Sequence, residues 1–210
     1  RSSPERKKVL NMAEKFPKVA QFTTVDAFRN YLKQENIRIG LADSVPSDGS
    51  AALAQKIECC GRTLGNRWSI LPMEGWDCED NGVPSELTRR RWLRFATSGA
   101  KLLYGTEAAA VMHSGRSNPQ QLMVADHTAE SLKTILAEMR AAHKAKFGNA
   151  DDLMIGLQLT HSGRYSHPNR PDRLEARTAY AHPLLDRKFS CGPENVVSDA
   201  EVEDIERHFV

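Results

Sequence analysis

The chain has no long apolar run and no large excess of charge of one sign. Its 210 residues carry a formal net charge of +2, so bulk electrostatics does not indicate a nucleic-acid partner. No apolar stretch approaches the roughly 20 residues that a membrane-spanning helix needs, and no signal-peptide core follows the N-terminal Arg-Ser-Ser-Pro-Glu-Arg-Lys-Lys. With 40% hydrophobic and 27% charged residues, the composition is that of a globular protein that can bury one core.

Cysteine and histidine are sparse and show no ligand spacing. The four cysteines include no C-x-x-C pair, and a secreted disulfide framework is usually denser in a smaller chain. Cys59 and Cys60 are adjacent in an expected strand, where consecutive side chains point to opposite faces, so a shared metal ion is not predicted. The histidines form neither an H-x-H nor an H-E-x-x-H motif, and no zinc site is predicted. We expect free thiols in a reducing, cytoplasmic compartment.

Short apolar runs alternate with amphipathic segments along the chain. Residues 1–50 are predicted to be an N-terminal extension with a helix over 24–34, followed after the loop 43–50 by a domain over 51–210. A hairpin is expected over 56–67. Strands are expected over 68–72, 100–105 and 153–159, and helices over 85–98, 128–146 and from 198 onward. This order indicates parallel βαβ units and fits either an open sheet or a closed barrel.

The expected helices carry recognisable ends and apolar stripes. Thr24, Ser85 and Ser198 stand at helix starts, and Gly99 and Gly148 follow helix ends. The run Arg89 to Arg91 is typical of a solvated helix face rather than of a phosphate site. The side chains predicted to be buried are Leu87, Trp92 and Phe95 in one helix, and Leu132, Ile135, Leu136, Met139 and His143 in the next.

Two strand ends carry candidate site residues. In the run Leu71-Pro72-Met73-Glu74, the proline cannot donate to a sheet ladder, so pairing ends there and the backbone beyond it is free to bind a ligand. A plain strand-to-loop transition is the alternative. Gln158 lies between two leucines, and a buried unpaired amide costs roughly 1–3 kcal/mol. Its amide is therefore expected to bind a ligand or, alternatively, a neighbouring strand or loop.

Three segments together resemble a known family. The runs 66–77 and 156–164 each pass from a short apolar segment into a Gly-marked polar loop, as a barrel strand does where it opens into an active site. With the small residues of 104–111, they resemble the old yellow enzyme family, FMN-dependent ene-reductases and 2,4-dienoyl-CoA reductases built on a (β/α)8 TIM barrel. The resemblance covers about residues 56–210 and implies the first three βα units of such a barrel.

The resemblance also implies roles for individual residues. Trp76 would face the substrate, although a tryptophan packed on the barrel rim is an equal alternative, and His161 and Arg164 would shape the loop over the barrel mouth. Gln158 would bind the O2/N3 edge of the flavin. The implied cofactor-binding residues are Leu71, Pro72, Met73, Glu74, Ala108 and Gln158, with no metal site.

Glu74 departs from the family pattern, which usually places Thr or Cys after Pro-Met. A carboxylate beside the flavin would disfavour the anionic reduced form through like-charge repulsion. Glu74 is therefore expected to be protonated, to turn away, or to mark a subgroup that operates at a different potential.

The implied activity is that of an FMN-dependent oxidoreductase that uses NADH or NADPH to reduce an activated alkene, such as an enone or an enoyl thioester. The family's substrate-activating pair lies on a later strand, so catalytic residues are expected beyond residue 210. The 210-residue chain is then an N-terminal piece, inactive alone, that binds FMN weakly or not at all. A non-catalytic barrel fragment or binding module is the alternative.

A third class, a flavin-free barrel lyase or hydrolase, would need a metal cluster or a lysine at a strand end. Lys101 begins its expected strand, which counts against a Schiff base. A small-molecule substrate is the expected partner, with neither nucleic acid nor membrane. The oligomeric state is left open, a homo-oligomer included.

Overall fold

A computed structural model describes residues 16–210 of the chain. It divides the protein into two compact units, Arg1–Val45 and Pro46–Val210. No helix of the described residues has both the length and the apolar character needed to cross a bilayer.

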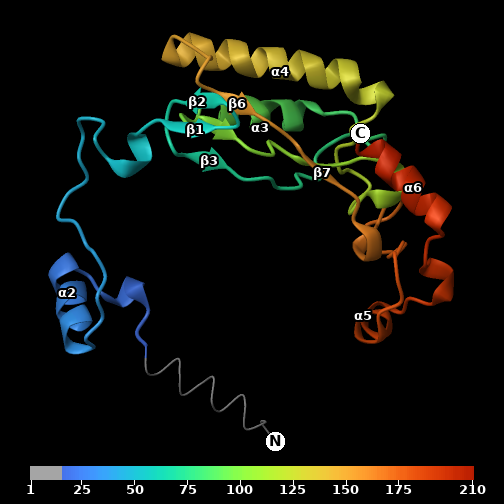
Figure 1. Ribbon diagram of the computed structural model, residues 1–210, viewed down its shortest axis with the longest axis horizontal. Coiled ribbons are helices and arrows are strands. Elements are labelled where there is room, and N and C mark those ends of the chain that lie inside the picture. The colour runs from blue at the N-terminus through green and yellow to red at the C-terminus, as the bar shows by residue number, and fades with distance from the viewer. Residues whose placement is uncertain (1–15) are drawn as a thin grey trace, which may run out of the picture. The chain divides into compact units, whose positions relative to one another are not determined.

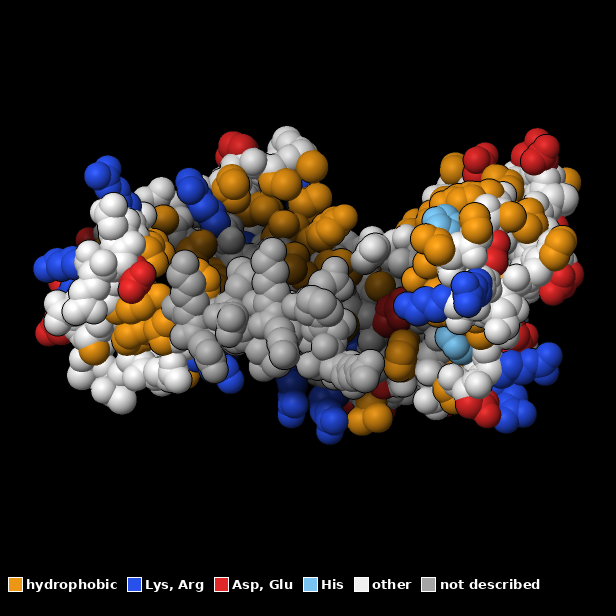
Figure 2. All heavy atoms as spheres, turned by 90° about the horizontal axis from the view of Figure 1, so that it is seen from below, with side chains coloured by type: hydrophobic (Ala, Val, Ile, Leu, Met, Phe, Trp, Pro, Cys, Tyr) orange, Lys and Arg blue, Asp and Glu red, His pale blue; other side chains and the backbone are white. Residues whose placement is uncertain are grey.

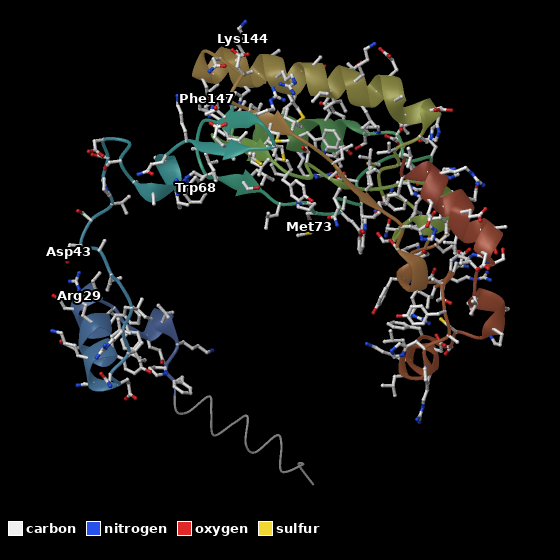
Figure 3. The ribbon with its side chains drawn as sticks, in the orientation of Figure 1. Arg29, Asp43, Trp68, Met73, Lys144 and Phe147 are labelled. Atoms are coloured by element: carbon white, nitrogen blue, oxygen red, sulfur yellow. The ribbon has the colours of Figure 1, made fainter. Side chains whose placement is uncertain are left out.

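The first unit contains the 3-10 turn η1 (Val19–Gln21) and the helix α2 (Val25–Gln34). The Thr24 hydroxyl accepts a hydrogen bond from the backbone N–H three residues on, at 3.1 Å, which confirms the predicted N-cap. Phe22 packs against Phe28 and Tyr31, with ring centroids 5.3 and 5.0 Å apart. Arg29 forms an ion pair with Asp43 (Figure 3).

The second unit is an α/β structure built on parallel strands. The parallel sheet β3-β4-β6 is extended by the parallel pair β5-β7, and β1 and β2 form an antiparallel hairpin. The strands are β1 (Ile57–Cys59), β2 (Arg62–Leu64), β3 (Ser69–Ile70), β4 (Leu102–Leu103), β5 (Ala108–Ala110), β6 (Met154–Ile155) and β7 (Gln158–Thr160). The helices are α3 (Glu86–Ala96), α4 (Asp126–Phe147), α5 (Pro183–Phe189) and α6 (Asp199–His208), and the 3-10 turns are η2 (Ala52–Ala54), η3 (His113–Gly115), η4 (Gly163–Tyr165) and η5 (Pro193–Asn195).

The seven short strands group into a hairpin and three parallel runs. The β4 and β5 segments follow one another along one run, and β6 and β7 along the next. Hydrogen bonds bridge the gaps, because Gly156 donates to the Leu103 carbonyl at 3.0 Å and accepts from the Thr106 N–H at 2.9 Å. The strand order therefore confirms the predicted parallel βαβ units. A closed barrel is not present among the described residues.

One face of the parallel sheet is covered by helices. Figure 1 shows α4 running along this face with α3 beside it. The core between the helices and the strands consists of Cys78, Trp92, Ala96, Ala100, Leu103, Ala109, Leu122, Ile135, Met139 and Leu153.

Leu87 was predicted to be buried but is 53% exposed. The buried stripe of α3 consists of Thr88, Trp92 and Ala96, and Leu87 lies about 100° around the helix from Thr88, on the side away from the other two. Leu136 is displaced from Ile135 in the same way and is 39% exposed.

The helix ends follow local chemistry. The Ser85 hydroxyl caps α3 by accepting from two backbone N–H groups, and Ser198 and Glu201 form the capping box of α6. Gly148 ends α4 with φ of 85°. These three predictions are confirmed.

A buried polar cluster joins α4 to the starts of β4 and β6. The His143 Nδ1 lies 2.7 Å from the Ala96 carbonyl, and its Nε2 lies 2.9 Å from the Lys101 ammonium. Lys101 also forms an ion pair with Asp152 at 2.8 Å. The hydrogen bonds explain how a histidine can occupy the buried stripe of α4.

Candidate functional site

The C-terminal ends of the three parallel runs meet at one edge of the sheet. Gly105 lies so close to Pro72 that an added Cβ would be 2.3 Å from the Pro72 Cβ. Ala108 pairs directly with Gln158 in the β5-β7 ladder. The structure thus brings the predicted residues of 71–74, Ala108 and Gln158 into one continuous strip.

The face of the sheet opposite the helices carries exposed apolar side chains. Leu71 is 71% exposed, Met73 is 72% exposed and Tyr104 is 53% exposed. Met73 points away from the α4 layer (Figure 3), and hydrophobic side chains are visible when this side of the molecule is viewed (Figure 2). Leu103 belongs to the core under the helices, so its neighbours along the strand belong to this open face.

Gln158 lies in the same strip and its side chain is exposed. Its position between two leucines predicted a partner for the amide, but β7 pairs with β5 alone and both Gln158 and Leu159 are exposed on it. Among the described residues, no group forms a hydrogen bond to its side-chain amide, while its backbone N–H donates to the Glu107 carbonyl at 3.1 Å. The amide therefore offers a free donor and a free acceptor in one plane.

The other predicted residues have distinct surroundings. Ala108 is buried, and its carbonyl accepts a hydrogen bond from the Gln121 amide at 2.9 Å. Pro72 and Glu74 are half-buried. Trp76 is 49% exposed and has φ of 50°, a backbone region in which a bulky residue is uncommon.

Glu74 is turned into the protein and is not left facing the open side. Its carboxylate accepts hydrogen bonds from the Ser117 hydroxyl, from the Trp76 indole at 3.0 Å and from the Gln121 amide at 3.3 Å. Of the three expectations stated for Glu74, this geometry matches the one in which the side chain turns away.

Gln121 joins the ends of all three runs and was not identified from the sequence. It is fully buried. Its Nε2 donates to the Ala108 carbonyl at 2.9 Å and lies 3.2 Å from the Thr160 hydroxyl, in addition to the contact with Glu74. Its Oε1 accepts from the Ser117 N–H at 2.7 Å. It follows a turn-rich segment, where no periodic pattern separates a buried glutamine from a solvated one.

A second cluster, formed by Asp77, Arg91 and Glu107, holds the loop after β3. Arg91 on α3 forms hydrogen bonds to both Asp77 oxygens at 2.8 and 3.1 Å and an ion pair with Glu107. Glu107 is 1% exposed and also accepts a hydrogen bond from the Gly75 N–H. This corrects the prediction that residues 89–91 form a solvated face, because α3 turns Arg91 toward the strand ends. Arg89 also has partners, with Glu138 at 2.6 Å and Glu86 at 3.1 Å.

Burial and the charges within the cluster shift the pKa values of its three residues. Burial raises the pKa of Glu107, although the Arg91 guanidinium opposes the shift. Burial acts on Asp77 in the same direction, but the hydrogen bonds from Arg91 and Thr88 outweigh it, so the pKa of Asp77 lies below its usual value. The two carboxylates outweigh the effect of burial on Arg91 and raise its pKa. The guanidinium is therefore permanently charged.

His161 and Arg164 order the loop that follows β7. The His161 Nδ1 accepts from the Gly163 N–H at 3.1 Å, and its ring packs against Gly115 so closely that a Cβ there would be 2.5 Å from Cδ2. Arg164 forms an ion pair with Asp186 and donates to the Tyr180 carbonyl at 3.1 Å. Burial lowers the pKa of His161. These contacts tie the loop to η3 and to α5.

The strip has features that fit a flat heteroaromatic ring. A Cβ added at Gly156 would have no neighbour within 4 Å, so the backbone between β6 and β7 is open to close approach. Leu71 and Met73 offer apolar contact on the open face, and the Gln158 amide is free to form hydrogen bonds. The amide therefore fits the polar edge of an isoalloxazine ring, and the apolar side chains and the open backbone fit its face.

Comparison with known proteins gives structural likenesses only. No family model and no curated protein matches the chain. It is similar to an old yellow enzyme homologue from Zymomonas mobilis, with 23% identity and a TM-score of 0.45 over 54% of this chain and 29% of that one. It is also similar to a 2-naphthoyl-CoA reductase in complex with 2-naphthoyl-CoA, with 18% identity and a TM-score of 0.45 over 56% of this chain and 16% of that one. The chain thus spans less than a third of either protein, and neither likeness assigns a family.

Proposed function

We propose that the chain forms the N-terminal part of an FMN-dependent oxidoreductase of the old yellow enzyme type, built on a TIM barrel. The whole protein would use NADH or NADPH to reduce an activated alkene, such as an enone or an enoyl thioester. The observation that carries the proposal is the strip at the ends of the three parallel runs, where the free Gln158 amide lies beside the open backbone at Gly156.

The segments that carry the sequence motifs also lie together in the structure, which supports this proposal. The runs that resemble the family in sequence, 66–77, 104–111 and 156–164, are the three that lie together at the C-terminal ends of parallel strands. In barrel enzymes, active sites lie at this end of the strands. The resemblance and the fold therefore point to the same edge of the sheet.

The residues of this chain would bind and orient the ring. Gln158 would donate to and accept from one polar edge of the flavin, and Leu71 and Met73 would pack on its face. Glu107 would hold the loop after β3 by accepting from the Gly75 N–H, and Gln121 would hold the Glu74 carboxylate turned into the protein. When bound, FMN supplies the hydride chemistry.

The proposal is tested by titrating the chain with FMN and with lumiflavin while flavin fluorescence is recorded. We expect weak, saturable quenching by both flavins with similar affinity. Barrel phosphate sites usually lie in the loops after strands seven and eight, and in the proposed barrel the three parallel runs would be the first three strands, so the phosphate should add little. Gln158→Ala should weaken binding roughly fivefold, which corresponds to the loss of about 1 kcal/mol of hydrogen bonding.

Gln120→Ala is the matched control, because Gln120 is exposed and belongs to the loop before Gln121. It should leave both affinities unchanged. Absence of saturation at millimolar flavin, or equal binding by the wild type and Gln158→Ala, would contradict the proposed ring site.

A further inference from the structure

The turn between β1 and β2 places two cysteine side chains together. Cys59 ends β1 and pairs with Arg62, so the two connecting residues are Cys60 and Gly61. Both have positive φ, 50° and 71°, which is the pattern of a type I′ hairpin turn. The prediction that the two cysteines point to opposite faces was wrong, because it assumed that Cys60 belongs to an extended strand.

The two sulfurs lie 3.9 Å apart. Cys60 is exposed and Cys59 is half-buried. The hairpin is held in register by a hydrogen bond of 2.5 Å between the Thr63 hydroxyl and Glu58, and Leu64 anchors it in the protein with 2% exposure. The sulfurs are thus presented to solvent on a constrained turn.

The residue at position 60 is unusual for its backbone. Both central positions of a type I′ turn favour Gly, Asn or Asp, and a left-handed conformation costs other residues about 1–2 kcal/mol. Cysteine offers no local hydrogen bond that offsets this cost as asparagine would. What it contributes to the turn is a second thiol beside Cys59.

We propose that Cys59 and Cys60 form a two-sulfur binding site for a thiophilic divalent cation such as Zn²⁺ or Cd²⁺. Zinc–sulfur bonds of about 2.3 Å at a tetrahedral angle place two sulfurs about 3.8 Å apart, which matches the separation in this turn. Binding forms two metal–sulfur bonds and releases the two thiol protons to solvent, with no change of oxidation state.

A disulfide is the less favourable use of the same pair. Adjacent Cα atoms are about 3.8 Å apart, below the range of about 4.4–6.8 Å that disulfides usually span, so a bond between them is strained. A bridging metal ion accepts the separation that already exists.

The protein supplies only two of the four ligands that a tetrahedral zinc ion takes. Among the described residues, no group of three or more His, Cys, Asp or Glu side chains is placed to hold a metal ion. Two coordination positions would therefore be filled by water or by a small ligand, unlike a structural zinc site with four protein ligands. An ion held in this way remains exchangeable.

The hairpin lies at the other end of the strands from residues 71–76. The Gly65 N–H, just after β2, donates to the Asp152 carbonyl before β6 at 3.2 Å. Figure 1 shows β1 and β2 near the end of α4 that precedes β6. The metal site therefore does not rest on the proposed flavin site, and each can fail without the other.

The test is a Cd²⁺ titration of the reduced chain, monitored by the thiolate-to-cadmium charge-transfer absorbance in the ultraviolet. The wild type should saturate near one ion per chain. Cys59→Ser and Cys60→Gly should each abolish the saturable band. Cys60→Gly should retain or raise the melting temperature, because glycine tolerates the positive φ, so loss of binding in this variant is not loss of the fold.

Cys191→Ser is the matched control. Cys191 is also half-buried and free, and its removal should leave the titration unchanged. A band that persists in Cys60→Gly, or no saturable band in the wild type, would overturn the proposal.

Discussion

At the scale of single residues, Gly105 sets how closely two strand ends approach. It has φ of 63°, and an added Cβ would lie 2.3 Å from the Pro72 Cβ and 3.0 Å from its Cα. Gly105→Ala therefore adds a clash with a rigid ring to a strained backbone. We expect it to lower the free energy of unfolding by about 2–4 kcal/mol, as measured by urea denaturation.

Gly148→Ala separates the effect of the steric clash from the effect of backbone strain. Gly148 also has a positive φ, 85°, but a Cβ there would meet nothing within 4 Å. Only backbone strain remains, so the loss should be about 1 kcal/mol. Equal losses in the two variants would show that the contact with Pro72 does not limit the approach of the strands.

At the scale of elements, α3 is tied to the strand ends by one arginine. Arg91→Met would leave the buried Glu107 and the half-buried Asp77 without their cation. Breaking such a pair by removing one partner is strongly destabilising, and we expect a loss of about 3–5 kcal/mol near neutral pH. Arg90 is exposed on the same helix, so Arg90→Met should change stability by less than about 0.5 kcal/mol. Chemical denaturation of both variants measures the difference, and similar losses would contradict the role of the cluster.

The same variant gives a pH dependence with a defined sign. In the wild type, the pKa of Asp77 is lowered, so its stabilising contribution is present above the ordinary aspartate pKa and is lost as pH falls through the native value. Burial already raises the pKa of Glu107, and without Arg91 it should rise further. The native state of Arg91→Met then binds a proton that the unfolded state releases, so its stability falls as pH rises. The gap between wild type and variant should shrink from about pH 7 to about pH 5; a gap that is constant or widens would contradict this assignment.

Elements also show where sequence reasoning succeeds. The ends marked by Thr24, Ser85, Ser198 and Gly148 were predictable because a cap is formed within a few residues. Leu87 and Arg91 were not, because the side of α3 that is buried depends on how the helix packs on the sheet. The apolar pattern of α3 leaves the position of the buried stripe uncertain by one residue, which is about 100° around the helix. Tertiary contacts decide which of these residues are buried.

For the candidate site, the sequence located the strand ends but not what holds them. Pro72 and Gln158 were identifiable because proline and an amide are unusual in a strand. Gln121 and Glu107 were not, since their partners come from segments up to 47 residues away in the chain. Cys60 was misplaced because its conformation follows from the turn and not from residue preference.

At the scale of the whole second unit, its sheet has one face covered by α3 and α4 and another that exposes Leu71 and Met73. Contiguous exposed apolar surface favours self-association. The double variant Leu71→Ser, Met73→Ser should therefore reduce the associated fraction in sedimentation velocity, and reduce binding of a hydrophobic dye, at an unchanged melting temperature. Leu87→Ser alters a side chain that is 53% exposed on α3 and should change neither. If Leu87→Ser reduced association equally, general surface hydrophobicity rather than the open face of the sheet would be responsible.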